Sequence, residues 1–130
     1  MKVRGIRGAT TANSNTKESI VEVTTELLTE LVARNEIDAD DVAAVTFTAT
    51  PDLNAEFPAV AARLGLGWTN VALMCAQEMQ VPDGQPRTIR VMILLNTDKD
   101  AAELENVYLR DAVDLRLRGS ERERDRRSAN

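Results

Sequence analysis

Apolar side chains recur with a helical period in one long segment of the chain. From Ile20 to Leu31 they return every three or four positions, which places them on one face of a helix that ends near Asn35. Ahead of this segment, Asn15 is followed three residues later by Glu18, a pattern typical of a capping box. The pattern therefore predicts one long amphipathic helix that begins at a polar turn.

Four other segments have the patterns of strands. Residues 2–10 alternate short apolar and basic side chains, and residues 42–50 are rich in β-branched residues. Residues 71–75 and 88–96 are short apolar runs, and strong turn residues at 82–84 lie between them. We expect these last two strands to form a hairpin or to be near neighbours in the sheet.

Two shorter helices complete the predicted elements. Residues 54–64 suit a helix with Pro58 in its first turn, and residues 101–109 have a short helical pattern. The resulting order, strand, helix, strand, helix, strand, strand and short helix, predicts an α+β fold in which helices cover one face of a mixed sheet. We expect residues 1–117 to form one domain and the charged residues 118–130 to be a disordered tail.

The composition removes several classes of catalyst. The 130 residues include no histidine, which excludes Ser-His-Asp and Cys-His catalysis and removes the usual ligand of zinc and non-haem iron sites. The single cysteine, Cys75, cannot form an internal disulfide and lacks the paired spacing of a zinc site. We therefore expect no metal and no cofactor, and a chemistry that uses carboxylates, arginines or the positioning of a substrate.

Charge and hydropathy indicate which partners and which cellular location to expect. The formal net charge is -5, whereas binding to nucleic acid favours a basic field, so we expect no nucleic-acid partner. The longest apolar run, residues 91–95, is far shorter than the roughly 20 residues of a transmembrane helix. Arg4 and Arg7 stand where a signal peptide would need an apolar segment. We expect a soluble, cytoplasmic protein that does not bind membranes.

Arg90 is the most informative charged residue. Strand alternation places it on the same face as Met92 and Leu94, where a guanidinium is costly unless an anion or a carboxylate meets it. The alternative is that Arg90 lies near the strand start and extends to solvent. Glu78 follows Cys75 by three residues, so both could project from one rim of the sheet, although a solvated loop carboxylate and a small core thiol are the simpler interpretations.

Other candidates look ordinary one by one. Arg7 lies beside glycines that would let backbone approach a ligand, but a plain surface arginine explains it equally well. Phe57 and Tyr108 suit packing, and Arg63 and Arg116 suit solvated cations. Taken separately, none of these residues supports a function.

Five short motifs follow one another along residues 1–117. They are RGIRGATT at 4–11, ATPDL at 49–53 with FPA at 57–59, CAQEM at 75–79, IRVM at 89–92 and VYL at 107–109. In order and spacing, these motifs together resemble one family, the AroH-type chorismate mutases. The resemblance implies a homotrimer of the pseudo-α/β-barrel class that converts chorismate to prephenate in phenylalanine and tyrosine biosynthesis, without a cofactor.

The resemblance also implies roles for the candidate catalytic residues. Arg7 and Tyr108 would hold a substrate carboxylate, and Arg90 would reach the ether oxygen and a carboxylate. Glu78 with Cys75 would contact the ring hydroxyl. In such trimers, each active site combines residues of two neighbouring subunits.

A further set of positions would bind the substrate by the same resemblance. Phe57 and Leu73 look like an apolar wall, Ala59 lines the same edge, and Arg63 with Arg116 would guard the entrance. Two positions depart from the family pattern: Val60 replaces an expected basic residue, and Met74 replaces a smaller polar one whose backbone can still serve. The complete substrate-binding set implied by the resemblance is Tyr108, Phe57, Ala59, Arg63, Leu73, Met74, Leu115 and Arg116.

The residue types suit the implied reaction. A concerted rearrangement needs no nucleophile and no proton transfer, so the missing histidines are compatible with it. Arginine forks at Arg7, Arg90 and Arg116 would clamp a flexible dianion in its reactive shape. A fixed cation at Arg90 would oppose the negative charge that the ether oxygen gains in the transition state.

Two other function classes use a similar set of residues. Reactive-intermediate deaminases are small trimers of similar fold that hydrolyse imines with an arginine in the interface cleft. A non-catalytic trimeric sensor of small carboxylic acids would need the arginines but not Glu78. Assays with chorismate and with a 2-aminoacrylate source would distinguish these classes.

Overall fold

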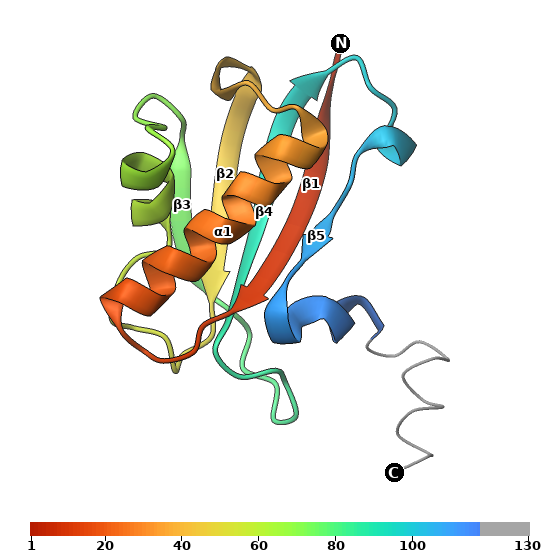
Figure 1. Ribbon diagram of the computed structural model, residues 1–130. Helices are drawn as coiled ribbons and strands as arrows, with labels where there is room; N and C mark the ends of the chain where they lie inside the picture. The colour runs from red at the N-terminus through yellow and green to blue at the C-terminus, as the bar shows by residue number, and fades with distance from the viewer. Residues whose placement is uncertain (118–130) are drawn as a thin grey trace.

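The two longest strands form the middle of the sheet. In the computed structural model, which describes residues 1–117, the five strands have the spatial order β3-β2-β4-β1-β5 (Figure 1). β1 pairs with β4 in an antiparallel register that runs from Lys2 opposite Thr97 to Thr11 opposite Thr88. The strands are β1 (Lys2–Thr11), β2 (Val42–Ala49), β3 (Leu73–Gln77), β4 (Thr88–Thr97) and β5 (Val107–Tyr108).

Parallel pairs lie at both edges of this sheet. β3 runs parallel to β2, and β5 runs parallel to β1, while β2 and β4 are antiparallel. The predicted mixed sheet is therefore confirmed. The expected hairpin between β3 and β4 is wrong because β2 lies between them. The turn near 82–84 does reverse the chain direction, but residues 78–87 are long enough to pass β2, whose Val45 and Phe47 fill the core.

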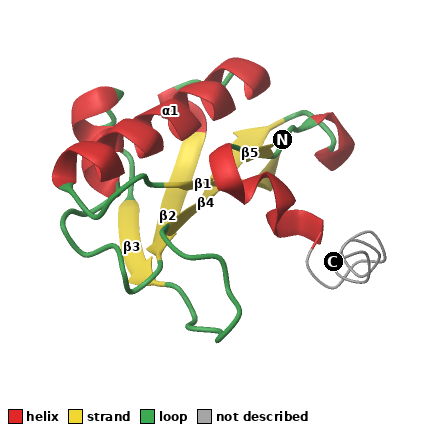
Figure 2. Ribbon diagram, turned by 60° about the horizontal axis from the view of Figure 1, so that its bottom comes forward, coloured by secondary structure: helices red, strands yellow, loops and turns green. Residues whose placement is uncertain are grey.

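Helix α1 (Lys17–Asn35) covers one face of the sheet diagonally (Figure 1). Its buried Leu27, Leu28 and Leu31 pack with Ile6 of β1 and Phe47 of β2 in the main core. Burying each such side chain stabilises the fold by about 1.5–3 kcal/mol. Figure 2 shows the helical turn next to β3 on the same side as α1, so the predicted one-sided helical layer is confirmed.

Gly8 lets α1 approach β1 closely. A Cβ atom at Gly8 would lie 2.9 Å from Leu31 Cδ1, 3.1 Å from Leu27 Cδ1 and 3.1 Å from the Val107 carbonyl oxygen. These distances are shorter than ordinary carbon contacts, so a side chain would push the helix or β5 away. The glycine therefore sets the distance between the helix and the strand that carries Arg7.

The N-terminal cap of α1 differs from the prediction. Thr16 is the capping residue, and its hydroxyl accepts a hydrogen bond of 3.1 Å from the Ser19 amide. A capping box of Asn15 and Glu18 is therefore wrong. Asn15 is engaged elsewhere, because its Oδ1 accepts hydrogen bonds from the backbone of Asn54 and of Ala55.

The predicted short helices are also corrected. In the segment expected at 54–64, residues 54–58 are not helical, because Asn15 holds their start, and helix begins only at Ala59 and includes η2 (Ala61–Gly65). In the segment expected at 101–109, only η3 (Ala101–Glu103) is helical. Residues Val107 and Tyr108 instead form β5, because the free edge of β1 offers backbone partners and buries Val107 completely.

Two helical turns and the exact bounds of one strand differ from the prediction. The strand expected at 71–75 lies two residues later, at Leu73–Gln77. No helix within residues 1–117 has the length and apolar character needed to span a membrane. The expected disordered tail, 118–130, lies outside the described residues. The unanticipated turns are η1 (Ala39–Asp41) and η4 (Arg110–Leu117).

Candidate functional site

Four of the predicted site residues line one hollow. It lies on the face of the sheet opposite α1, here called the open face, and has a volume of about 210 Å³. Strand alternation sends side chains of β1 and β4 alternately to α1 and to this face, so Arg7 and Arg90 lie on the same side. The hollow is lined by Arg7, Gly8, Thr46, Thr48, Glu78, Arg90, Val91, Met92 and Tyr108.

An ion pair crosses the hollow between β4 and the residue that follows β3. Arg90 Nη1 lies 3.2 Å from Glu78 Oε2, and the same carboxylate oxygen accepts a hydrogen bond of 2.7 Å from Thr48 Oγ1. The Glu78 backbone is fixed as well, since its amide donates to the Ala49 carbonyl at 2.9 Å. Arg90 therefore has the carboxylate partner that makes a guanidinium on this strand face less costly.

Arg90 is only partly enclosed by its own chain. Its side chain is 50% exposed, whereas that of Glu78 is 22% exposed. Both expectations for Arg90 therefore hold in part, because it has a carboxylate partner and also reaches solvent. An exposed ion pair of this kind contributes about 0–1 kcal/mol to stability, so folding alone does not explain its geometry.

Arg7 and Tyr108 approach the hollow from neighbouring strands. Tyr108 of β5 is paired with Ala9 of β1, two residues beyond Arg7. The Arg7 amide donates a hydrogen bond of 2.9 Å to Asn106 Oδ1, which secures the backbone beside the side chain. Within residues 1–117, no carboxylate forms an ion pair with the Arg7 guanidinium.

A second group of predicted residues lies at a different place, the edge formed by β3 and η2. Cys75 contacts the backbone of Ala59 and lies near Arg63. Its side chain is partly buried and packs against the core. Burial raises the pKa of the Cys75 thiol, and the Ala59 backbone and the Arg63 charge oppose this only in part. The thiol is therefore neutral near pH 7. This edge, called the β3–η2 edge below, comprises Phe57, Ala59, Arg63, Leu73 and Cys75.

Cys75 and Glu78 do not share a rim of the sheet within one chain. Cys75 is paired with Phe47, a residue of the core, and its side chain faces the α1 layer with that of Leu73. Met74, between them, is 63% exposed and points the other way. The expectation that Cys75 and Glu78 project together is wrong for the single chain, because one thiol lies on the covered face and the carboxylate lies in the hollow.

Two predicted residues belong to η4. Leu115 is half-buried there, and the side chain of Arg116 lies outside the described part of the structure. The start of η4 is attached to α1, since Arg110 Nε and Nη2 lie 3.3 Å and 3.2 Å from the two carboxylate oxygens of Glu26. η4 thus begins two residues after Tyr108, which lines the hollow.

Thr46 and Thr48 were not predicted as site residues. Both line the hollow, and Thr48 donates to Glu78. Their signal was present in the sequence, because threonines alternate with Val45 and Phe47 along β2. What the sequence did not show is that β2 adjoins β4, which brings these hydroxyls beside Arg90.

The donor set of the hollow suits an organic anion rather than a metal ion. It offers two guanidinium groups, a tyrosine and two threonine hydroxyls around one carboxylate. In the described residues, no group of three or more histidine, cysteine, aspartate or glutamate side chains is placed to hold a metal. Arginine forks instead bind carboxylates through paired hydrogen bonds.

Comparisons with known proteins agree on one family. The family described as chorismate mutase type I matches residues 3–118. The chain is 43% identical to chorismate mutase AroH of Bacillus subtilis (strain 168) over 116 residues, 89% of this chain and 91% of that protein. It is 48% identical to chorismate mutase AroH of Thermus thermophilus over 115 residues, 88% of this chain and 93% of that protein.

A solved structure leads to the same family. The chorismate mutase from Clostridium thermocellum superposes with a TM-score of 0.82 at 48% sequence identity, covering 85% of this chain and 97% of that one. Fold, sequence and the arginine-lined hollow are therefore consistent with one another. They do not favour the imine deaminase or the carboxylate sensor. The chain belongs to the type I chorismate mutases, the AroH-type isomerases that convert chorismate to prephenate.

Proposed function

We propose that this protein rearranges chorismate to prephenate and that the hollow on its open face is one half of the active site. The observation that supports this most directly is the arrangement of Arg90, Glu78 and Arg7. Glu78, itself held by Thr48, keeps Arg90 in place, and Arg7 presents a cation without a carboxylate partner among residues 1–117. A dianionic substrate has two carboxylates to offer to such a pair of arginines.

Clamping the substrate supplies the first part of the catalysis. Chorismate is flexible and reacts only from a compact shape in which the two ends that will bond are close. Arg7 and Tyr108 would hold one carboxylate, and Arg90 would reach the other together with the ether oxygen. Orientation of this kind lowers the barrier because the entropy is lost on binding rather than in the reaction.

Electrostatic stabilisation supplies the second part. As the carbon–oxygen bond breaks, the ether oxygen gains negative charge, and a cation held in advance favours that state over the resting substrate. Glu78 contributes by holding Arg90 through the 3.2 Å ion pair and by offering a carboxylate oxygen to the ring hydroxyl. No proton has to leave the enzyme in this scheme, which agrees with a sequence without histidine.

We further propose that a second copy of the chain completes the site. The β3–η2 edge carries Phe57, which is 66% exposed, and Arg63, which is also exposed, yet neither reaches the hollow of its own chain. In a homotrimer, this edge of one subunit would face the hollow of the next. Water would then be excluded from Arg90, which strengthens its interaction with the ether oxygen.

Exposed apolar side chains on the open face support this assembly. Met92 and Leu94 of β4 are 47% and 37% exposed, and Val3 of β1 is 55% exposed. A group of large apolar side chains on one sheet face is typical of a surface that packs against another subunit. The assembly would therefore bury this face and close the hollow in one step.

The reaction itself is tested with purified protein and chorismate. We expect chorismate to disappear and prephenate to form in equal amounts without any added cofactor. Binding of chorismate without turnover would support a sensor instead, and turnover of a 2-aminoacrylate source alone would support an imine deaminase. Neither nucleic acid nor a membrane is part of this proposal, and the cytoplasm remains our expectation for where the protein acts.

Sharing of sites between subunits is tested by complementation. Arg90→Ala removes a residue of the hollow, and Arg63→Ala removes a residue of the β3–η2 edge. We expect each variant alone to be impaired. If the two variants are unfolded together and refolded, about a quarter of the sites in randomly mixed trimers will have both halves intact. Activity should then rise above the mean of the two variants toward that fraction. If the mixture keeps that mean activity, each site belongs to one chain.

A further inference from the structure

Strand β5 is too short to fix its own position. It consists of Val107 and Tyr108, which pair with only Gly8 and Ala9 of β1. The connection that precedes it, residues 98–106, contains a single short helical turn. Two residue pairs at the edge of a sheet, after a connection of this length, would open readily. Something else must therefore hold Tyr108 beside the hollow.

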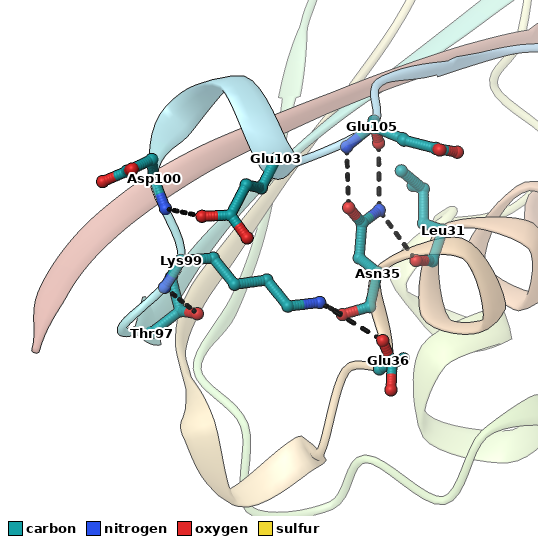
Figure 3. A network of polar contacts seen from close by, with 8 residues as sticks. All are labelled: Leu31, Asn35, Glu36, Thr97, Lys99, Asp100, Glu103 and Glu105. Carbon is teal, nitrogen blue, oxygen red and sulfur yellow. Dashed lines mark hydrogen bonds and ion pairs between the residues drawn. The ribbon is translucent and has the colours of Figure 1, made fainter.

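The side chain of Asn35, the last residue of α1, holds the residue just before β5 (Figure 3). Its Oδ1 accepts a hydrogen bond of 2.8 Å from the Glu105 amide, and its Nδ2 donates one of 2.9 Å to the Glu105 carbonyl. Nδ2 also donates to the Leu31 carbonyl at 3.0 Å, so both of its hydrogens are used. Asn35 is 2% exposed, which excludes water from these bonds.

The two bonds to Glu105 imitate the pairing of a strand. A residue in an antiparallel ladder exchanges one N–H and one C=O with its partner, and the carboxamide of Asn35 does the same with Glu105. The attachment continues along the chain, since Asn106 Oδ1 accepts from the Arg7 amide and the Leu109 amide donates to the Ala9 carbonyl, both at 2.9 Å. The side chain of a helix residue therefore holds the backbone two residues before the short β1–β5 ladder begins.

A cation strengthens the helix end from which Asn35 projects. Lys99 Nζ lies 3.4 Å from the Asn35 carbonyl oxygen and 3.5 Å from Glu36 Oε1 (Figure 3). A positive charge at the C-terminus of a helix is favourable because the last carbonyl groups have no partner within the helix. Lys99 itself is fixed by its amide, which donates to Thr97 Oγ1 at 3.1 Å. Both ends of the 98–106 connection are thus attached to the end of α1.

We infer that Asn35 is a positioning residue for substrate binding, acting through Glu105 and β5 on Tyr108. The inference rests on the proposed role of Tyr108 in holding a substrate carboxylate. Glu105 is exposed, so without Asn35 its backbone groups can bond to water and the fold survives. What changes is the time that Tyr108 spends in place beside Arg7.

The test compares Asn35→Ala with Tyr108→Phe in steady-state kinetics with chorismate. Tyr108→Phe removes one hydrogen bond to a charged group and should raise KM about tenfold. Asn35→Ala should raise KM by about the same factor or less, with kcat within about twofold, because this contact binds substrate and transition state alike. The double variant should have the KM of Tyr108→Phe alone. Multiplication of the two KM effects would overturn the inference.

A second measurement follows the backbone without substrate. Exchange of the Leu109 amide hydrogen reports opening of β5 from Ala9. In Asn35→Ala, we expect this amide to exchange at least about tenfold faster, while the amides in the middle of α1 keep their rates. Unchanged protection at Leu109 would overturn the inference. Since no substrate is present, this result does not depend on the proposed function.

Two further variants separate positioning from general loss of stability. Val23→Ala truncates a fully buried residue of the same helix in the smaller core with Ile20 and Leu53, away from the 98–106 connection. It should leave KM and the relative protection of Leu109 unchanged, and an equal rise in KM would overturn the inference. Asn35→Asp turns a carboxylate oxygen toward the Leu31 and Glu105 carbonyl oxygens in a buried place at the end of a helix, so its KM should rise at least as much as that of Asn35→Ala.

The outcomes also distinguish a failure here from a failure of the proposed site. If Tyr108→Phe leaves KM unchanged, Tyr108 does not hold a carboxylate, and the link from Asn35 to substrate binding is wrong with it. Faster exchange at Leu109 in Asn35→Ala would still support the attachment of β5. If Tyr108→Phe raises KM and Asn35→Ala does not, the proposed function stands and the inference about Asn35 fails.

Discussion

The two faces of the sheet are completed in different ways. On the face covered by α1, Ile6 and Phe47 are fully buried against leucines of the helix, and the chain supplies every partner. On the open face, Arg90 is half exposed beside Met92, which is 47% exposed. The covered face therefore determines whether the chain folds, while the open face keeps charged and apolar side chains accessible. This difference predicts that substitutions on the two faces change different measured quantities.

The largest effect is expected on the open face at Arg90. Arg90→Lys keeps a positive charge but loses the planar fork, and Arg90→Ala loses both, so kcat should fall by about 10²–10³, the loss typical of removing one preorganised donor. The free energy of unfolding should change by no more than about 1 kcal/mol, because the residue is half exposed. Initial rates with saturating chorismate and urea unfolding provide the two measurements.

A matched control for Arg90 lies on the helix. Arg34 forms an ion pair with Glu30 at 3.0 Å, and its side chain is 44% exposed, so its surroundings resemble those of Arg90 except for the hollow. Arg34→Lys should leave kcat unchanged. If Arg90→Lys also kept the parental kcat, the electrostatic role of Arg90 in the reaction would be wrong.

The next prediction compares the two faces through the stability of alanine variants at two glycines of β1, Gly8 on the covered face and Gly5 on the open face. The Cβ of Gly8→Ala would meet Leu31, Leu27 and the Val107 carbonyl at 2.9–3.1 Å, so we expect a loss of about 1–3 kcal/mol in the free energy of unfolding. Among residues 1–117, the added Cβ of Gly5→Ala would meet only Met92 Sδ at 3.8 Å and Leu94 Cδ2 at 3.9 Å, which are ordinary contacts.

Fluorescence of the single tryptophan, Trp68, which is 5% exposed, reports unfolding of both glycine variants. The variants must be compared at one protein concentration, because the stability of the proposed trimer would depend on it. Equal destabilisation by Gly5→Ala and Gly8→Ala would show that the helix contact at Gly8 is not the reason for the glycine.

A smaller effect is expected at Glu78. Glu78→Ala leaves Arg90 and Thr48 without their common acceptor, so kcat/KM should fall by roughly tenfold to a hundredfold. Glu78→Gln keeps an oxygen that accepts from Thr48 and from the ring hydroxyl, so its loss in kcat/KM should be smaller. Equal losses in the two variants would show that the negative charge of Glu78 matters and its hydrogen bonds do not.

The smallest effect is expected for the stability of a variant on the covered face. Thr10 is fully buried, and within residues 1–117 its hydroxyl has no hydrogen-bond partner. Thr10→Val replaces the hydroxyl by a methyl group of similar size, so we expect a gain of up to about 1 kcal/mol in the free energy of unfolding and no change in kcat. Thermal unfolding measures it. A loss of stability would mean that the Thr10 hydroxyl is satisfied after all.

Long elements were predicted well from the sequence, whereas short ones were predicted with shifted bounds or as the wrong type. The helix that ends at Asn35 and the strands at Lys2–Thr11 and Thr88–Thr97 follow from side-chain periods that repeat over many residues. The strand at Val107–Tyr108 was predicted as helix, because two residues carry no period of their own. Its conformation depends on the free edge of β1 and on the Asn35 side chain, which are distant in sequence.

Part of the candidate site was also predictable from the sequence, and part was not. Alternation along β1 and β4 indicated the face on which Arg7 and Arg90 lie, and the structure brings them together with Glu78 and Tyr108. Cys75 was expected beside Glu78, but its strand turns it toward the core. Periodicity assigns a side chain to a face, whereas its neighbour on that face depends on strand order.

The sequence by itself determined the helix, the longer strands, the absence of histidine chemistry and the family, since periods, composition and motifs are properties of the chain alone. Tertiary structure alone decided that β2 lies between β3 and β4, that Glu78 meets Arg90 at 3.2 Å and that Asn35 holds Glu105. These contacts join residues far apart in sequence. Their geometry depends on which backbone groups find partners when the core closes, and no local pattern records that outcome.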